Sequence, residues 1–343
     1  MSHTLSNGFV EPVLKTLHVP IHDLTYGREL IPISPAERIL RSEPYVHSEF
    51  KLPFPYYGDT DRFIYYQTWS LPTASVVRDV DIFFIHGIND YGGRFSESCI
   101  PILEQGFRII APDLPGFGRS GGLHAYFSDV QELVDTVHLV ITHVKEQNSL
   151  INKSTKTILF GESLGGMIVL TYAIKHPENF DAFNVLCPLI YVSPESRPYK
   201  IAEMIGKVLT KTPLGRLPLL AAHRGKCSSN PLIEEEFMND PMTYNGNLRC
   251  STGLALQNNI EWLGANLKEV KKPFLVQHGL NDRVTDCKGS KDLYEQASTP
   301  TNEKSILEYE GCEHMMLRDP VAGEKVFKDC VDWFISMDAK FKS

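Results

Sequence analysis

The sequence has few of the features that mark export or membrane insertion. Its seven cysteines (99, 187, 227, 250, 287, 312 and 330) are odd in number and form no C-x-x-C pair. Scattered cysteines favour free thiols in a reducing compartment over a disulfide framework or a zinc site. The first residues lack a basic segment followed by an apolar one, and no stretch approaches the length of a transmembrane helix. We therefore expect a cytoplasmic protein.

Patterns that bind nucleic acids, metals or phosphates are also missing. The formal net charge is −8 at pH 7, which argues against a nucleic-acid partner. No H-E-x-x-H pattern occurs, and the glycine-rich stretch at 116–122 lacks the G-x-x-x-x-G-K-[ST] order of a P-loop. The sequence thus predicts no metal ion and no cofactor.

One stretch joins a strand, a sharp turn and a helix around a serine. Residues 157–160 form a short apolar run, residues 161–165 match G-x-S-x-G, and residues 167–173 predict a buried helix. This succession is typical of a nucleophile elbow, in which a strained turn raises the serine above the edge of a sheet. The N-terminus of the following helix favours a developing oxyanion. Ser163 is therefore the candidate nucleophile.

A serine nucleophile needs a base, and the base needs an acid that orients it. In hydrolases with such an elbow, these partners follow in the order Ser, Asp, His, each on a loop after a strand. Asp282 and His314 each lie a few residues past the end of a predicted strand, in that order. We assign Asp282 as the orienting acid and His314 as the base. Asp286 is the alternative acid, while a core-facing or supporting role is expected for His278.

Two backbone N–H groups are expected to bind the oxyanion. One belongs to Leu164, which follows the nucleophile, and the other to Ile88, in the glycine-rich loop after His86 and Gly87. Because an amide needs no particular side chain, the apolar character of both residues is no objection. His86 and Gly87 are expected to shape the loop.

The order of predicted elements indicates an α/β fold. Apolar strand-like runs alternate with helical patterns up to residue 189 and return after residue 273, as in a parallel sheet with helices on both faces. We expect an N-terminal extension at 1–45, a first core part at 46–189, a helical cap at 190–262 and a second core part at 263–343. The cap is expected to lie over Ser163.

With these motifs in place, the chain resembles the monoglyceride lipase group of α/β hydrolases, which also holds lysophospholipase-like proteins. The similar segments are the oxyanion loop (85–95), the D-x-x-G-x-G-x-S segment (113–120), the N/S-D-P of the cap (239–241) and the acid loop (278–290). The resemblance implies an α/β-hydrolase fold with a mostly parallel sheet. It also implies that Asp90 and Arg94 lie near the glycerol hydroxyls of the substrate. Thr285 stands where animal members of the group carry a cysteine.

Residues and resemblance together predict a serine esterase that hydrolyses acyl esters, foremost monoacylglycerols, through an acyl-enzyme intermediate. A lysophospholipid, an aryl ester or another metabolite ester would use the same triad, and so would an acyltransferase. The intact triad argues against a non-catalytic binding protein, and nothing recognisable selects the N-terminal amine of a peptidase substrate.

Apolar residues at 201–209 and 214–220 are expected to hold an acyl chain under the cap, although packing of the cap on the core would explain them equally well. Basic residues flank this surface, and a second hypothesis is therefore peripheral contact with a membrane or lipid droplet. They are Lys200, Lys207, Lys211 and Arg216.

Overall fold

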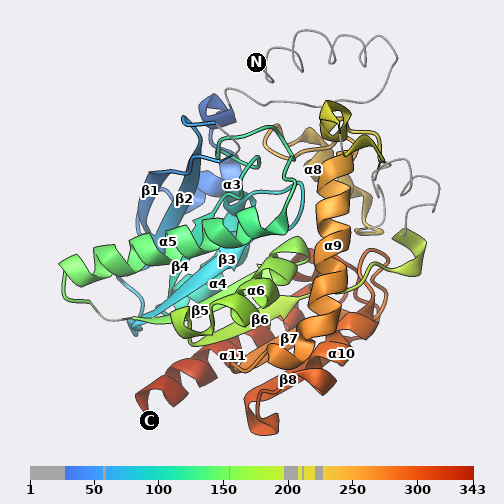
Figure 1. Ribbon diagram of the computed structural model, residues 1–343. Helices are drawn as coiled ribbons and strands as arrows, with labels where there is room; N and C mark the ends of the chain where they lie inside the picture. The colour runs from blue at the N-terminus through green and yellow to red at the C-terminus, as the bar shows by residue number, and fades with distance from the viewer. Residues whose placement is uncertain (1–27, 57–58, 154, 197–207, 211, 221–226) are drawn as a thin grey trace.

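The computed structural model describes residues 28–56, 59–153, 155–196, 208–210, 212–220 and 227–343 (Figure 1). Its centre is an eight-stranded sheet in the order β1-β2-β4-β3-β5-β6-β7-β8. Only the pairs β1–β2 and β2–β4 are antiparallel, so the predicted, mostly parallel sheet is confirmed. The strands are Val46–Pro53 (β1), Phe63–Ser70 (β2), Val80–Ile85 (β3), Arg108–Pro112 (β4), Lys156–Glu162 (β5), Ala182–Leu186 (β6), Phe274–Gly279 (β7) and Lys304–Tyr309 (β8).

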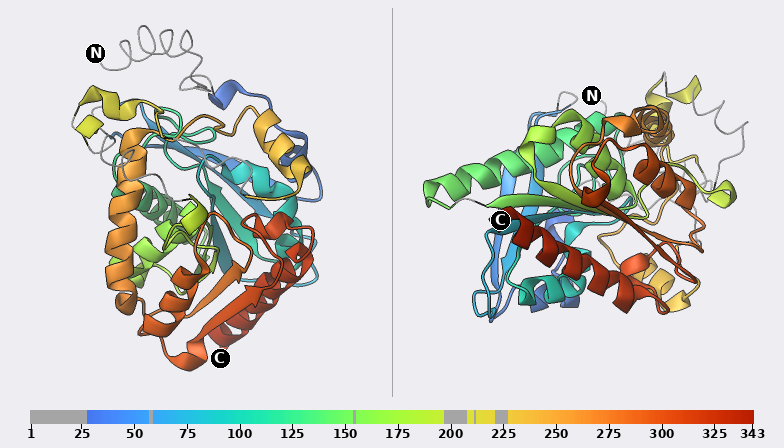
Figure 2. Two further views of the ribbon diagram at one scale, coloured as in Figure 1. Left: turned by 90° about the vertical axis from the view of Figure 1, so that its right-hand side faces the viewer. Right: turned by 90° about the horizontal axis from the view of Figure 1, so that it is seen from below.

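Helices cover both faces of the sheet (Figure 2). Helices α5, α6, α9 and α10 pack over one face, α4 and α11 cover the other, and α3 packs against α4. The helices are Pro35–Ile39 (α3), Ser96–Glu104 (α4), Val130–Leu150 (α5), Leu164–Lys175 (α6), Pro231–Asn239 (α8), Cys250–Asn266 (α9), Cys287–Gln296 (α10) and Gly323–Lys342 (α11). Among the described residues, none of these helices combines the length and hydrophobicity needed to cross a bilayer.

The central strands are mostly apolar, as is typical of strands with both faces covered by helices. Every residue of β3 and β7 is buried, and β5 is exposed only at its first residue. Two clusters of buried apolar side chains form the core, one on each side of the sheet. The loops that follow β3, β5, β7 and β8 are therefore anchored to a rigid edge of the sheet. Open α/β sheets bind their ligands at this edge.

The described part of the expected cap contacts two of these loops. The Tyr244 N–H donates to the Asn89 carbonyl oxygen over 2.9 Å, and the Met315 N–H donates to the Cys227 carbonyl oxygen over 3.1 Å. Helix α9 packs against α5 and α6 along the flank of the sheet and runs past the predicted boundary at residue 262. Residues 201–207, Lys200 and Lys211, expected to form part of the apolar and basic surface, lie outside the described residues.

Candidate active site

The serine turn joins β5 to α6 in a backbone conformation that L-residues rarely adopt. Ser163 has φ 56° and ψ −114°. A Cβ at Gly165 would lie 1.9 Å from the carbonyl oxygen of Ile85, and one at Gly161 would lie 2.5 Å from the carbonyl oxygen of Gly165. Only glycine permits these approaches, so the G-x-S-x-G spacing is what lets the turn close against β3. The packing around this strained turn keeps the serine at the N-terminus of α6.

The structure brings together the three residues predicted to form a triad. The Ser163 hydroxyl lies 3.0 Å from Nε2 of His314, and Nδ1 of His314 lies 2.7 Å from Oδ2 of Asp282. The alternative acid, Asp286, instead caps α10, where its Oδ1 accepts the Lys288 N–H over 3.0 Å. Asp282 is thus the carboxylate that contacts the histidine.

Both oxygens of Asp282 accept hydrogen bonds. Oδ1 accepts from the backbone N–H groups of Val284, over 2.7 Å, and Thr285, over 3.0 Å. Oδ2 lies 2.6 Å from the Thr285 hydroxyl and 3.4 Å from Nε2 of His278, whose Nδ1 lies 2.7 Å from the Ser290 hydroxyl. His278 therefore supports the acid, and the carboxylate is held as an anion by several donors.

The charges in the site shift two pKa values in opposite directions. Burial alone would raise the pKa of Asp282, but the charge of His314 and the surrounding hydrogen bonds lower it strongly. Burial likewise would lower the pKa of His314, yet Asp282, and to a smaller degree Glu162, raise it above its ordinary value. The pair therefore favours a negative aspartate that stabilises the imidazolium as it forms.

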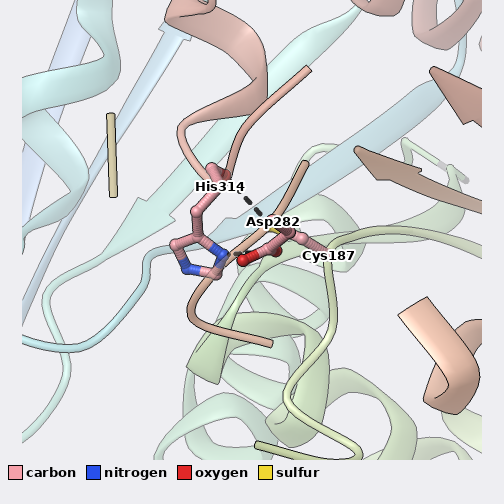
Figure 3. Close-up of side chains that lie close together, drawn as sticks. All are labelled: Cys187, Asp282 and His314. Carbon is pink, nitrogen blue, oxygen red and sulfur yellow. Dashed lines mark hydrogen bonds and ion pairs between the residues drawn. The ribbon is translucent and has the colours of Figure 1, made fainter. Parts of the chain in front are cut away.

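A buried thiol lies beside this pair (Figure 3). Ligand atoms of Cys187, Asp282 and His314 all lie within 4.8 Å of one another. Burial raises the pKa of the Cys187 thiol well above its usual range, and the thiol donates to the His314 carbonyl oxygen over 3.3 Å. A protonated thiol and a carboxylate already surrounded by donors are poor metal ligands, so we interpret the three side chains as one hydrogen-bonded cluster.

The loop after β3 passes beside the nucleophile. A Cβ at Gly87 would lie 3.6 Å from Cβ of Ser163. The buried His86 ring shapes this loop, because its Nδ1 lies 2.7 Å from the Gly87 carbonyl oxygen and its Nε2 accepts the Leu114 N–H over 2.9 Å. Ile88 follows directly, and Leu164 begins α6, where the first N–H groups have no acceptor within the helix. Leu164 therefore follows Ser163 directly in the chain, and Ile88 follows the glycine that packs against the serine.

Asp90 and Arg94 form a buried ion pair in the same loop. Nη1 of Arg94 lies 2.8 Å from Oδ2 of Asp90, and the guanidinium carbon lies 5.1 Å from the centre of the Phe237 ring of α8. Nε and Nη2 of Arg94 are buried and have no hydrogen-bond partner among the described residues. These two groups form the edge of a guanidinium that can bind an oxyanion or two hydroxyl oxygens in parallel.

Glu162 is a polar residue of this region whose role the sequence did not reveal. It is the second residue of the G-x-S-x-G motif and is 3% exposed. Its Oε1 has no partner within the described chain, and burial raises its pKa to about 7. The sequence did offer one sign of such a role, namely an acidic residue directly before the candidate nucleophile.

Known proteins support the same fold and chemistry. A family model described as "Serine aminopeptidase, S33" (Hydrolase_4) matches residues 78–321. The caffeoylshikimate esterase of Arabidopsis thaliana is 28% identical over 76% of this chain and 79% of its own length. The monoglyceride lipase of Rattus norvegicus is also 28% identical, over 74% of this chain and 81% of its own.

Solved structures place the chain on the same scaffold. The monoacylglycerol lipase of Paleococcus ferrophilus superposes with a TM-score of 0.67, at 23% identity, over 85% of this chain and 98% of its own. A soluble variant of the monoglyceride lipase of Saccharomyces cerevisiae gives the same TM-score at 20% identity, over 83% of this chain and 95% of its own. With the α/β-hydrolase fold and the family match together, the chain belongs to the Hydrolase_4 family and is a serine ester hydrolase.

Proposed function

We propose that Ser163, His314 and Asp282 hydrolyse small acyl esters through an acyl-enzyme intermediate. Ser163 Oγ attacks the acyl carbonyl carbon while His314 Nε2 takes the hydroxyl proton over the 3.0 Å contact. The imidazolium then gives that proton to the departing alcohol oxygen. A water molecule, deprotonated by the same nitrogen, then attacks the acyl-serine, and the imidazolium returns the proton to Ser163 Oγ as the acid leaves. Asp282 holds the tautomer of His314 and stabilises its charge over 2.7 Å.

The amides of Ile88 and Leu164 stabilise the tetrahedral intermediate in this proposal. Each donor is expected to contribute about 3 kcal/mol in the transition state. The proximity of Gly87 to the nucleophile and the start of α6 at residue 164 support this assignment.

We propose monoacylglycerols as the leading substrate class. The observation that carries this choice is the pair of buried N–H groups on Arg94, which lack partners among the described residues. Leaving a buried donor unpaired costs about 1–3 kcal/mol, so a site that retains two such donors is suited to a substrate that pairs them. The hydroxyls of a glyceryl group are suitable acceptors, and Asp90 keeps the guanidinium in place over 2.8 Å. Aryl esters offer no such groups.

A second class is an ester whose alcohol carries a carboxylate. The same edge of Arg94 would bind a carboxylate with two parallel hydrogen bonds, which are stronger than those to neutral hydroxyls. The similarity to a protein named caffeoylshikimate esterase is as high as that to the monoglyceride lipases. A lysophospholipid, whose phosphate is also an anion, belongs to the same group of alternatives, as does acyl transfer to an alcohol.

We further propose that the cap makes peripheral contact with a membrane or lipid droplet. Val208, Leu214 and Leu219 are exposed apolar residues in the same stretch of the sequence as Arg216. Substitution of Leu214 by Asp is expected to weaken binding to liposomes while hydrolysis of a soluble short-chain ester continues. Equal loss of both properties would contradict membrane contact.

The experiment that tests the proposed function is turnover of an ester panel by wild type and Ser163→Ala. The panel holds monoacylglycerols of several chain lengths, lysophosphatidylcholine, a diacylglycerol, an aryl acetate and an ester of a hydroxy acid. We expect preference for monoacylglycerols and a loss of about 10⁴-fold or more in the variant. Preference for the hydroxy-acid ester would favour the second class, and an active Ser163→Ala would overturn the mechanism.

A further inference from the structure

A short segment before the first strand enters the interior of the protein. The family model begins at residue 78, so residues 28–41 lie outside the part that matches it. Even so, Arg28, Glu37 and Leu40 are almost completely buried. Helix α3 packs against α4 and against the turn Gly92–Phe95 (η3) of the oxyanion loop. A mere surface extension would not bury two charged side chains.

Glu37 contacts the oxyanion loop directly. A Cβ at Gly93 would lie only 2.1 Å from Oε1 of Glu37 and 2.9 Å from Nε2 of Gln67. Gln67 in turn donates to Oε1 of Glu37 over 3.4 Å. Only a residue without a side chain fits between them, so the loop that carries Asp90 and Arg94 rests on the Glu37 carboxylate.

The same carboxylate reaches the loop by a second route. Nη1 of Arg119 donates to Oε1 of Glu37 over 2.9 Å, and the Arg119 N–H donates to Oδ2 of Asp113 over 2.7 Å. Oδ1 of Asp113 accepts the N–H of Gly92 over 2.9 Å. Glu37, Arg119 and Asp113 therefore form a buried chain of charged groups that ends on the backbone of the oxyanion loop.

Arg28 fastens the other end of the segment. Its guanidinium donates to the carbonyl oxygens of Gly118, over 2.8 Å, of Gly122, over 3.1 Å, and of Ser120. These residues belong to the same turn as Arg119. The N-terminal segment therefore holds this turn in two ways. Glu37 accepts a hydrogen bond from the Arg119 side chain, and Arg28 donates hydrogen bonds to backbone carbonyl oxygens of the turn.

We propose that residues 28–41 form a brace that holds the oxyanion loop in its reactive geometry, with Glu37 as a positioning residue. The inference rests on the proposed role of the Ile88 amide in binding the oxyanion. Glu37 acts through Gly92, Gly93 and Arg119, and it touches neither the ester nor the triad. Loss of its charge lets the loop shift and moves the Ile88 amide away from the oxyanion. A shift of this kind slows the acyl-transfer step for every ester.

The test compares Glu37→Gln with Asp338→Asn in the full chain. Asp338 is a matched control, because it is 2% exposed and ion-paired with Arg78 but lies on α11, and is given no role at the site. Its partner Arg78 precedes β3, whereas the oxyanion loop follows that strand. Reactive sites are first counted by titration with a fluorophosphonate, so that the rates refer to folded enzyme. Then kcat and KM are measured with an aryl acetate and a monoacylglycerol.

We expect Glu37→Gln to lower kcat per reactive site about tenfold with both esters, while Asp338→Asn keeps kcat within about twofold of wild type. A purely structural role would lower the number of reactive sites or the unfolding midpoint and leave kcat per site unchanged, which would overturn the proposal. Equal losses of kcat in the two variants would overturn it as well. If Glu37→Gln does not fold, Arg28→Met decides, with a fall in kcat per site expected for the brace and none expected otherwise.

The same experiment separates the brace from the proposed function. If Ser163→Ala retains turnover, the mechanism is wrong and the Glu37 result no longer reports on an oxyanion. If Ser163→Ala is inactive and Glu37→Gln equals wild type per site, the brace alone is wrong. A preference for an ester other than monoacylglycerol leaves the brace intact, because its effect is expected on kcat with every ester.

Discussion

The two loops that flank Ser163 differ in how completely their polar groups are paired. On the acid loop, both oxygens of Asp282 accept hydrogen bonds, and His314 contacts the aspartate and the serine at its two ring nitrogens. On the oxyanion loop, Arg94 keeps two buried N–H groups without partners, and Asn89 keeps a buried Oδ1 without one, among the residues described. Oε1 of Glu162, next to the nucleophile in the chain, likewise has no hydrogen-bond partner in the described part of the chain.

We interpret this difference as a division between the groups that transfer protons and the groups that recognise the alcohol part of the ester. Groups that move protons must be held in one geometry before the ester arrives, and saturated hydrogen bonding provides that rigidity. Groups that recognise an alcohol must have free donors and acceptors until it binds, and a buried unpaired donor is a cost that the substrate removes. The acid loop should therefore affect all esters equally, and the oxyanion-loop pocket should affect only those with a polar alcohol.

We expect the greatest loss of activity from a substitution in the acid loop. Asp282→Asn keeps the shape of the side chain but removes the charge that stabilises the imidazolium, and the amide can favour the wrong tautomer of His314. We expect kcat/KM to fall about 10³-fold or more for every ester tested. Steady-state rates with an aryl acetate and a monoacylglycerol check this. A loss restricted to one ester would contradict a purely chemical role.

The next effect comes from the oxyanion-loop pocket. Arg94→Met is expected to lower kcat/KM for a monoacylglycerol about 10- to 100-fold, since two hydrogen bonds from a charged donor are lost, while the aryl acetate changes little. Arg108→Met is the control, because Arg108 is ion-paired with Asp81 at the opposite end of the sheet. Selectivity that is unchanged in Arg94→Met would show that the unpaired groups do not recognise the alcohol.

A smaller effect is expected at Thr285, whose hydroxyl lies 2.6 Å from Oδ2 of Asp282. Thr285→Val retains the volume and removes the donor, so the aspartate is held less firmly and kcat/KM should fall about tenfold or less for all esters. Thr285→Ser retains the hydroxyl and should restore most of the rate. If Thr285→Val keeps the rate and Thr285→Ser loses it, packing of the methyl group rather than the hydroxyl is what matters at this position.

The smallest effect is a shift of a pH profile. The Glu162 carboxylate helps to raise the pKa of His314 only where it is ionised, and burial raises the pKa of Glu162 itself to about 7. Glu162→Gln therefore removes a partial negative charge and lowers the pKa of His314 slightly. Because His314 must be neutral to accept the serine proton, the acidic limb of kcat/KM should move to lower pH. Rates with an aryl acetate between about pH 5 and 8 measure the limb. A limb that moves upward or not at all would contradict this coupling.

The sequence predicts best what local patterns determine. The strands and the elbow follow from apolar runs and from Gly161 and Gly165, whose close approaches allow no side chain. The candidate triad could be chosen because its residues follow strands in a fixed order. By contrast, Glu37 lies 82 residues from Arg119 in the chain, and no local pattern links them. The same holds for the buried atoms of Arg94 and Glu162 that have no partner within the residues described, since burial and hydrogen bonding depend on the whole fold.

Formation of the acyl-enzyme provides the most direct test of the proposed roles of Ser163 and Arg94. Wild type and Arg94→Met are mixed with a glyceryl ester and an aryl ester of the same acid, quenched within one turnover and analysed by peptide mass spectrometry. We predict that both esters place the same acyl group on Ser163, and that Arg94→Met slows its formation from the glyceryl ester only. An acyl group on another residue would contradict the assignment of Ser163 as the nucleophile, and equal slowing with both esters would contradict recognition of the alcohol by Arg94.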